Sequence, residues 1–189
     1  MTLDDIVDDL LLVVPGAPRG LVREQARRSV WHVCRDTRLF QADVYEAAIE
    51  KDVESLSIDA PADTEIQRIE TVKLVVSGRD DPYWLRAAYE DGELELIDVP
   101  TNAGTITVRA SLRPADASNA VPAVFDEFRD AIGDYATYRL LKMPGQKWTN
   151  PAAAGDHLGM YRSEVARMNV RRAQRMTAEP LRTTPHYLA

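Results

Sequence analysis

The chain has 189 residues, a net charge of −7 at pH 7 and a single cysteine. Its hydrophobic fraction of 45% and charged fraction of 28% are those of a globular protein and exclude a disordered or fibrous chain. Cys34 has no intrachain disulfide partner, which favours synthesis in a reducing cytoplasm. The apolar run over residues 10–14 is well short of the ~18 residues that a bilayer span requires, so we expect no export signal and no membrane anchor.

The two signs of charge are segregated along the chain. Residues 42–98 hold sixteen acidic side chains and five basic ones. Residues 19–38 and 162–182 each hold six arginines and only two acidic residues. Because local charge decides what a surface attracts or repels, the sequence predicts an acidic middle region flanked by two basic segments.

The N-terminal part of the chain predicts two helices. Thr2 and Asp5 have the spacing of a capping box, which starts a helix that ends before Pro15. A second helix is expected from about Pro18 to Thr37, because apolar residues recur there at steps of three and four and a proline is tolerated in a first helical turn.

The middle of the chain has the patterns of β-strands. Residues 66–76 are β-branched and partly alternating, residues 94–99 end at a proline, and residues 104–112 alternate cleanly. Residues 100–104 form a turn of hairpin length between the last two strands. Residues 43–58 are ambiguous between helix and strand, so we expect a sheet of about three to five strands.

Two further helices are expected after the strands. Apolar residues from Val124 to Tyr138 repeat at helical spacing, and residues 143–145 break that helix. Asn150 as N-cap and Pro151 in the first helical position then open the last helix.

These elements predict an α+β fold, in which a helical bundle built from N- and C-terminal helices carries an inserted, mostly antiparallel β-sheet. We divide the chain into the N-terminal helices of the bundle (1–40), a β-rich insertion (41–115), the C-terminal helices of the bundle (116–178) and an extended C-terminal arm (179–189). The arm contains two prolines and is too short to form a core of its own.

The sequence offers little to a catalytic mechanism. There are only three histidines to act as general bases, and His32 and Cys34 lie two residues apart, which places them on different faces of a helix. We therefore expect Cys34 to be buried, His32 to lie at the surface, and the chain not to be an enzyme.

No metal or cofactor is predicted either. The histidines and the cysteine lack the spacing of a zinc site, and we interpret the acidic residues of the first helix as a solvated helix start. Gly155 and Gly159 lack the third glycine and the preceding strand of a dinucleotide-binding fold, so we interpret them as points of close helix packing. The acidic residues of the first helix are Asp4, Asp5, Asp8 and Asp9.

The candidate functional residues are surface contacts. Four arginines on the last helix, with no aromatic residues between them, favour contact with protein over stacking on nucleic acid. The apolar residues of the C-terminal arm gain order only in the groove of a partner, the alternative being a disordered terminus. The predicted partner-binding residues are Arg167, Arg171, Arg172, Arg175, Leu181, Tyr187 and Leu188.

Two segments carry a resemblance to a known family. Residues 11–18, LLVVPGAP, lead into residues 26–37, ARRSVWHVCRDT, and residues 138–151 read YRLLKMPGQKWTNP. Together with the arginine-rich last helix, they resemble the head-to-tail connector (neck adaptor) proteins of tailed bacteriophages. The resemblance spans nearly the whole chain and consists of packing and loop signatures.

The resemblance implies a structural virion protein, an adaptor ring of typically twelve copies that connects the capsid portal to the tail. Its implied partners are the portal protein, a tail or nozzle/stopper protein and further copies of itself, while genomic DNA passes through the lumen without sequence-specific binding. It also implies synthesis in the host cytoplasm and a final place in the neck of the virion.

In such a ring we expect basic faces of one copy to meet the acidic sheet of the next. The alternatives are a nucleic-acid-binding protein, another accessory protein of phage assembly or packaging, or a small enzyme or ligand-binding domain whose site is built across subunits.

Overall fold

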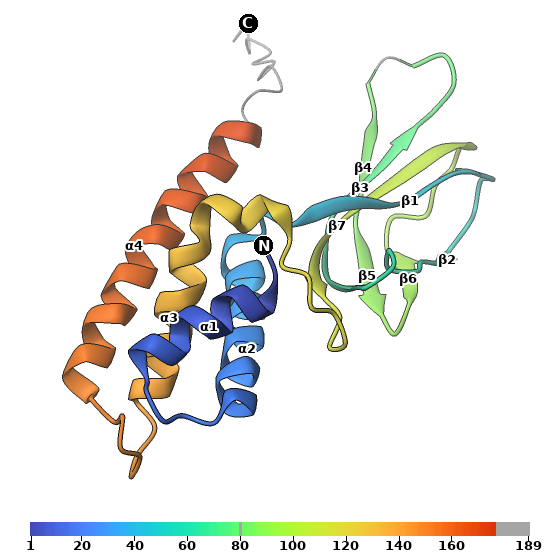
Figure 1. The fold of residues 1–189 in the computed structure, drawn as a ribbon. Coiled ribbons are helices and arrows are strands. Elements are labelled where there is room, and N and C mark those ends of the chain that lie inside the picture. Colours follow the sequence, from blue (N-terminus) through green and yellow to red (C-terminus); the bar gives the residue numbers. More distant parts are fainter. Residues whose placement is uncertain (80, 177–189) are drawn as a thin grey trace, which may run out of the picture.

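The computed structural model describes residues 1–79 and 81–176, with the helices on one side of the molecule and the strands on the other (Figure 1). The predicted C-terminal arm, residues 179–189, lies outside the described residues. The helices are α1 (Leu3–Val13), α2 (Arg19–Thr37), the 3₁₀-helix η1 (Ala123–Phe128), α3 (Arg129–Leu141) and α4 (Pro151–Met176). The strands are β1 (Gln41–Ile49), β2 (Ser55–Ser57), β3 (Thr64–Val75), β4 (Tyr83–Leu85), β5 (Ala87–Glu90), β6 (Glu93–Leu96) and β7 (Gly104–Pro114).

Local signals place the helix ends, as the sequence predicts. The Thr2 N–H donates to Asp5 Oδ2 (2.7 Å) and the Asp5 N–H donates to Thr2 Oγ1 (3.3 Å), which completes the capping box of α1. Arg38 ends α2 in a left-handed conformation with φ 50°. Asn150 caps α4, because its side-chain oxygen accepts a hydrogen bond from the Ala153 N–H (3.2 Å).

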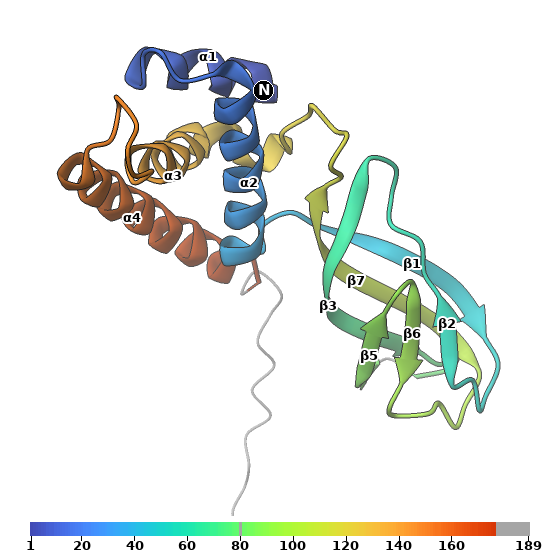
Figure 2. The same cartoon turned by 90° about the horizontal axis from the view of Figure 1, so that it is seen from below.

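The helices bury one hydrophobic core. Fully buried side chains come from each of them, for example Val7, Val22, Phe125, Ile132 and Met168. Burying a side chain of this size stabilises the fold by about 1.5–3 kcal/mol before the loss of chain entropy is subtracted. α1 crosses α2 obliquely, and α4 lies at the outer edge of the helical region in both views (Figures 1 and 2).

The strands form two antiparallel sheets that share a second core. The four-stranded sheet has the order β1-β7-β3-β4, and the three-stranded sheet has the order β2-β6-β5. Alternate residues of both sheets, such as Val72 and Val108 of the first and Leu94 and Leu96 of the second, belong to one buried cluster. The inner faces of the two sheets therefore pack on each other, and their outer faces look in opposite directions.

The prediction of a helical bundle with one inserted sheet is wrong. The strands between the helices divide into two sheets, not one, and α1 lies oblique to α2. The expected hairpin across residues 100–104 does not exist, because β6 pairs with β2 and β5 while β7 pairs with β1 and β3. A physical reason lies just after β6, where Asp98 accepts hydrogen bonds from the Arg86 N–H (2.9 Å) and guanidinium (2.7 Å) and holds the chain against the β4–β5 bend.

Two further expectations change in detail. The ambiguous residues 43–58 contribute to β1 and β2 and form no helix, and the helix expected from Val124 begins as η1, so that α3 starts only at Arg129. β4 and β5, which the sequence analysis did not anticipate, carry the aromatic residues Tyr83, Trp84 and Tyr89. No helix of the described residues is both long and apolar enough to cross a membrane.

The helical region is attached to the four-stranded sheet through α2. The Trp31 indole N–H donates to the Pro114 carbonyl (3.0 Å), and the Leu112 N–H donates to the Phe40 carbonyl (2.8 Å). The Arg113 guanidinium lies 4.4 Å from the Trp31 ring centroid, within cation–π range. These contacts fix the end of α2 against β7.

Candidate docking surfaces on the helical region

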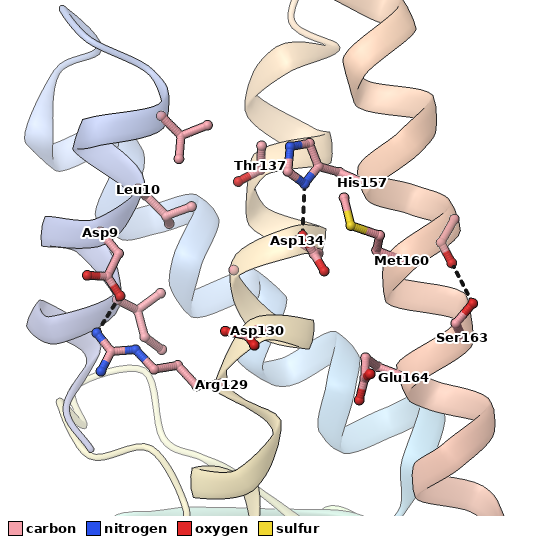
Figure 3. A pocket seen from close by; sticks show the side chains of 14 residues that line it. Asp9, Leu10, Arg129, Asp130, Asp134, Thr137, His157, Met160, Ser163 and Glu164 are labelled. Carbon is pink, nitrogen blue, oxygen red and sulfur yellow. Dashed lines mark hydrogen bonds and ion pairs between the residues drawn. The ribbon is translucent and has the colours of Figure 1, made fainter.

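A groove with a volume of about 700 Å³ lies between α1, α3 and α4 (Figure 3). Its floor is apolar, because Ile6 and Leu10 of α1 face it with side chains that belong to the buried core. At its edges Val13 is 49% exposed and Met160 is 46% exposed. A groove with an apolar floor and exposed apolar edges suits a protein partner better than a small polar ligand.

The polar groups of the groove are largely engaged with each other. His157 Nδ1 lies 2.8 Å from Asp134 Oδ1, and Arg129 forms an ion pair with Asp9 (Figure 3). The Ser163 hydroxyl donates to the Gly159 carbonyl of its own helix (3.2 Å), so it is not held by a base as a nucleophile would be. Among the described residues, no group of three or more His, Cys, Asp and Glu side chains has the geometry of a metal site.

The solvent-facing side of α4 carries a stripe of mostly small residues, in which Val170 is the largest. Its members recur at steps of three or four, which places them on one helical face, and every one of them is exposed. The stripe extends over roughly 32 Å at a rise of about 1.5 Å per residue. Its members are Ala152, Gly155, Gly159, Ser163, Ala166, Val170 and Ala173.

The two glycines of this stripe have no packing role among the described residues. A Cβ at Gly155 or Gly159 would meet no atom within 4 Å, so the predicted close helix packing of this pair does not occur within the described residues. Each glycine costs a helix about 0.5–1 kcal/mol relative to alanine. The small-residue face of α4 is thus kept open at some cost to the stability of the isolated helix.

The predicted arginine site is not a free basic surface. Arg167 pairs with Glu164 (3.1 Å), Arg171 pairs with Glu127, and both guanidinium groups lie within 6 Å of the Phe128 ring centroid. The partner-binding role predicted for these two arginines therefore competes with contacts inside the chain.

The other predicted partner residues are placed differently. The Arg172 guanidinium donates to the Thr37 carbonyl at the end of α2 (3.3 Å). Arg175 belongs to α4, and Leu181, Tyr187 and Leu188 lie outside the described residues.

The aspartates of α1 do more than start a helix. Asp4 pairs with Arg23, Asp8 pairs with Arg19 (2.5 Å), and Asn119 donates to the second oxygen of Asp4 (2.9 Å). With the Asp9 pair, these contacts attach α1 to α2 and α3. The sequence pattern predicted solvated carboxylates, and it did not predict these pairs. The six arginines of residues 19–38 were the signal that a basic neighbour was available.

His32, which was predicted to lie at the surface, is half-buried in a polar cluster between three helices. Its ring stacks on Tyr135 at 4.1 Å between centroids, and its Nε2 is 3.3 Å from Asp36, which also accepts a hydrogen bond from the Tyr161 hydroxyl (2.8 Å). Burial lowers the pKa of His32, although Asp36 opposes the shift. Cys34 is buried as predicted, and burial raises the pKa of its thiol to about 12.

Comparison with known proteins adds no family to this picture. No protein-family model matches the chain, and no curated protein sequence matches it. The resemblance to head-to-tail connector proteins therefore stays an expectation from the sequence.

Proposed function

We propose that the chain is a structural virion protein, an adaptor ring that joins the capsid portal to the tail of a tailed bacteriophage. The observation that carries this proposal is the small-residue face of α4. It runs the length of an outer helix, it is exposed throughout, and it retains two glycines that no contact among the described residues requires. Small residues let another helix approach closely, so the face is suited to contact between copies or with a partner.

The neighbouring groove supports the same proposal. Gly159, Met160 and Ser163 belong both to α4 and to the lining of the groove, so the two surfaces are continuous. Leu12, at the end of α1 and beside the groove residue Val13, is 83% exposed. Exposed apolar side chains next to a hollow are typical of surfaces that become buried in an assembly.

The arrangement of the arginines weighs against the nucleic-acid-binding alternative. Phosphate contacts would have to compete with the carboxylate partners of Arg167 and Arg171, and the acidic middle region would repel the backbone. The proposed ring needs no such contact, because DNA only passes through its lumen.

The proposal is tested by co-sedimentation of the purified protein with portal rings of the same phage. We expect the wild-type protein to join the portal fraction as a multi-copy ring, with the mass of the complex giving the copy number. A chain that neither self-associates nor binds portal or tail components would overturn the proposal. Tight DNA binding with a steep salt dependence would favour the nucleic-acid alternative instead.

The role of the α4 face is tested by Gly159→Trp, with Gly20→Trp as the matched control. Both glycines are exposed and helical, and a Cβ at either meets no atom within 4 Å, so both variants should fold. We expect Gly159→Trp to lose assembly and Gly20→Trp to keep it, with unchanged far-ultraviolet circular dichroism in both. Normal assembly of Gly159→Trp would show that this face is not the contact.

A further inference from the structure

A second cleft lies where the helical region meets the outer face of the four-stranded sheet. Its volume is about 590 Å³, and residues of β1, β3, β4, β7 and α4 and of the segment after α2 line it. Trp84 of the edge strand β4 stands in this lining with 60% of its surface exposed. Tryptophan and arginine are the residue types most enriched at the energetic centres of protein interfaces, and this cleft contains both.

Two arginines in the cleft have hydrogen-bonding capacity to spare. Arg38 lies 3.8 Å from Glu70, too far for a hydrogen bond, and Arg172 donates one long bond to the Thr37 carbonyl (3.3 Å). A guanidinium group has five N–H donors, and these are the contacts of the two side chains among the described residues. Both arginines can therefore donate hydrogen bonds to a carboxylate without losing a strong existing bond.

The acidic groups in the lining of the cleft do not neutralise its positive charge. Asp43 accepts hydrogen bonds from the Arg109 guanidinium at 2.7 and 3.1 Å, and these bonds lower its pKa. With Glu70 facing Arg38, the cleft lining holds three guanidinium groups and two carboxylates, which leaves it net positive.

The opposite charge gathers on the outer face of the three-stranded sheet. Glu90, Glu93, Glu95 and Glu54 are exposed there around a shallow hollow of about 380 Å³, and none has an ion-pair partner among the described residues. Glu90 of β5 lies directly across from Glu93 of β6. Like charges facing each other across two strands are destabilising, so a basic partner would relieve a repulsion that the isolated chain retains.

These two surfaces cannot meet within one copy of the chain. Trp84 pairs with Lys73 on the outer side of the four-stranded sheet, whereas the four glutamates lie on the outer side of the three-stranded sheet. The sheets pack through their inner faces, so the two outer sides look away from each other (Figure 2). Complementary surfaces that face in opposite directions are the arrangement that head-to-tail contact between identical copies requires.

We propose that the cleft around Trp84, Arg38 and Arg172 receives the carboxylates Glu90, Glu93 and Glu95 of a second copy of the chain. The inference rests on the proposed ring and names one contact within it. It narrows the expectation that a basic face of one copy meets the acidic sheet of the next: Arg167 and Arg171 already have carboxylate partners, whereas Arg38 and Arg172 do not have such strong contacts. Bidentate guanidinium–carboxylate bonds, strengthened by the exposed indole, would hold the contact.

The test is a charge exchange between the two surfaces, followed by sedimentation velocity of the protein alone and with portal rings. We expect Arg38→Glu with Arg172→Glu, and separately Glu93→Arg with Glu95→Arg, to weaken self-association at least about 30-fold each. An equimolar mixture of the two double variants should recover assembly, since every native or exchanged cleft then meets a complementary face. The contact should also weaken as sodium chloride is raised.

Controls separate this contact from the ring itself. Glu50→Arg with Asp59→Arg changes the same charge at exposed positions outside both surfaces and should leave assembly unchanged. Trp84→Ala removes a mostly exposed side chain, so it tests the cleft even if the Arg38→Glu, Arg172→Glu variant does not fold. The contact would be overturned if Trp84→Ala and the Glu93→Arg, Glu95→Arg variant both assembled like the wild type. It would also be overturned if the equimolar mixture of the two double variants stayed unassembled. The ring proposal would stand in both cases. A wild-type chain that never assembles would overturn both.

Discussion

The helical region and the three-stranded sheet use their charges in different ways. In the helical region, arginines meet carboxylates of the same chain, as Arg23 meets Asp4 and Arg129 meets Asp9. On the three-stranded sheet, Glu93 and Glu95 have no ion-pair partner among the described residues, and Glu93 lies across from the carboxylate of Glu90. Both regions are highly charged in the sequence, but the exposed glutamates of this sheet, unlike the paired charges of the helical region, do not hold the fold together.

This difference separates stability from assembly. Ion pairs between helices add modestly to stability, and removing one partner leaves the other without compensation. Unpaired carboxylates on an exposed strand face add nothing to the fold, so substitutions there should act on contacts with other molecules. Four measurements can break or sharpen this comparison, and they follow in order of expected effect.

The largest effect concerns Cys34, which shows how tightly the helical region is closed. Its pKa is raised from an ordinary value of 9.0 to about 12 by burial, so at pH 8 the folded chain holds about a thousandfold less thiolate than the unfolded chain. We expect iodoacetamide to label the native protein at least about 1000-fold more slowly than the urea-unfolded protein. Equal labelling rates would mean that the helical core opens freely.

The second measurement removes the pairs that hold α1. Asp4→Asn with Asp9→Asn should lower the free energy of unfolding by about 1 kcal/mol, because the pairs are partly exposed to solvent. For a chain of this size the melting temperature should fall by about 2–4 °C. Asp59→Asn, at an exposed position without an ion pair among the described residues, is the control and should leave the melting curve unchanged. An equal loss in both variants would contradict the comparison.

The third measurement is the pH dependence of stability. The pKa of His32 is lower in the folded chain than its ordinary value of 6.5, mainly because burial disfavours the charged ring. The unfolded state therefore binds this proton more readily, and stability should be fully present above pH 6.5 and decline as the pH falls below it. His32→Gln should flatten the melting temperature between pH 7 and about 5.

Carboxylates provide the reference for that pH profile. Asp98, whose pKa is lowered to about 2 by hydrogen bonds from Arg86, should lose its contribution only below about pH 4, where the unfolded carboxyl begins to bind protons. An unchanged profile of His32→Gln between pH 7 and 5 would assign the decline to another group.

The smallest effect is expected on the three-stranded sheet. Glu93→Gln removes the repulsion from Glu90 across the strand pair and should raise the free energy of unfolding by up to about 0.5 kcal/mol. Chemical denaturation with matched slopes measures the change. A loss of more than about 1 kcal/mol would reveal an internal partner for Glu93 and remove the contrast between the regions.

Local signals in the sequence were sufficient for the ends of several elements. The capping box of Thr2 and Asp5, the end of α2 at Thr37 and the cap at Asn150 each depend on residues within one or two helical turns. The burial of Cys34 followed in the same way, from its place on the apolar side of one helix. The periodicity of residues 104–112 likewise located β7.

The sequence by itself determined where most helices and the long strands lie and that acidic and basic segments alternate. Only the tertiary structure decided that the strands form two sheets, that the arginines of α2 and α4 meet carboxylates of the same chain, and that the small-residue face of α4 stays exposed. The physical reason is the separation along the chain of the residues that interact. Periodicity and caps depend on neighbours along the chain, whereas strand partners and ion pairs depend on residues such as Arg171 and Glu127, which meet only when the whole core forms.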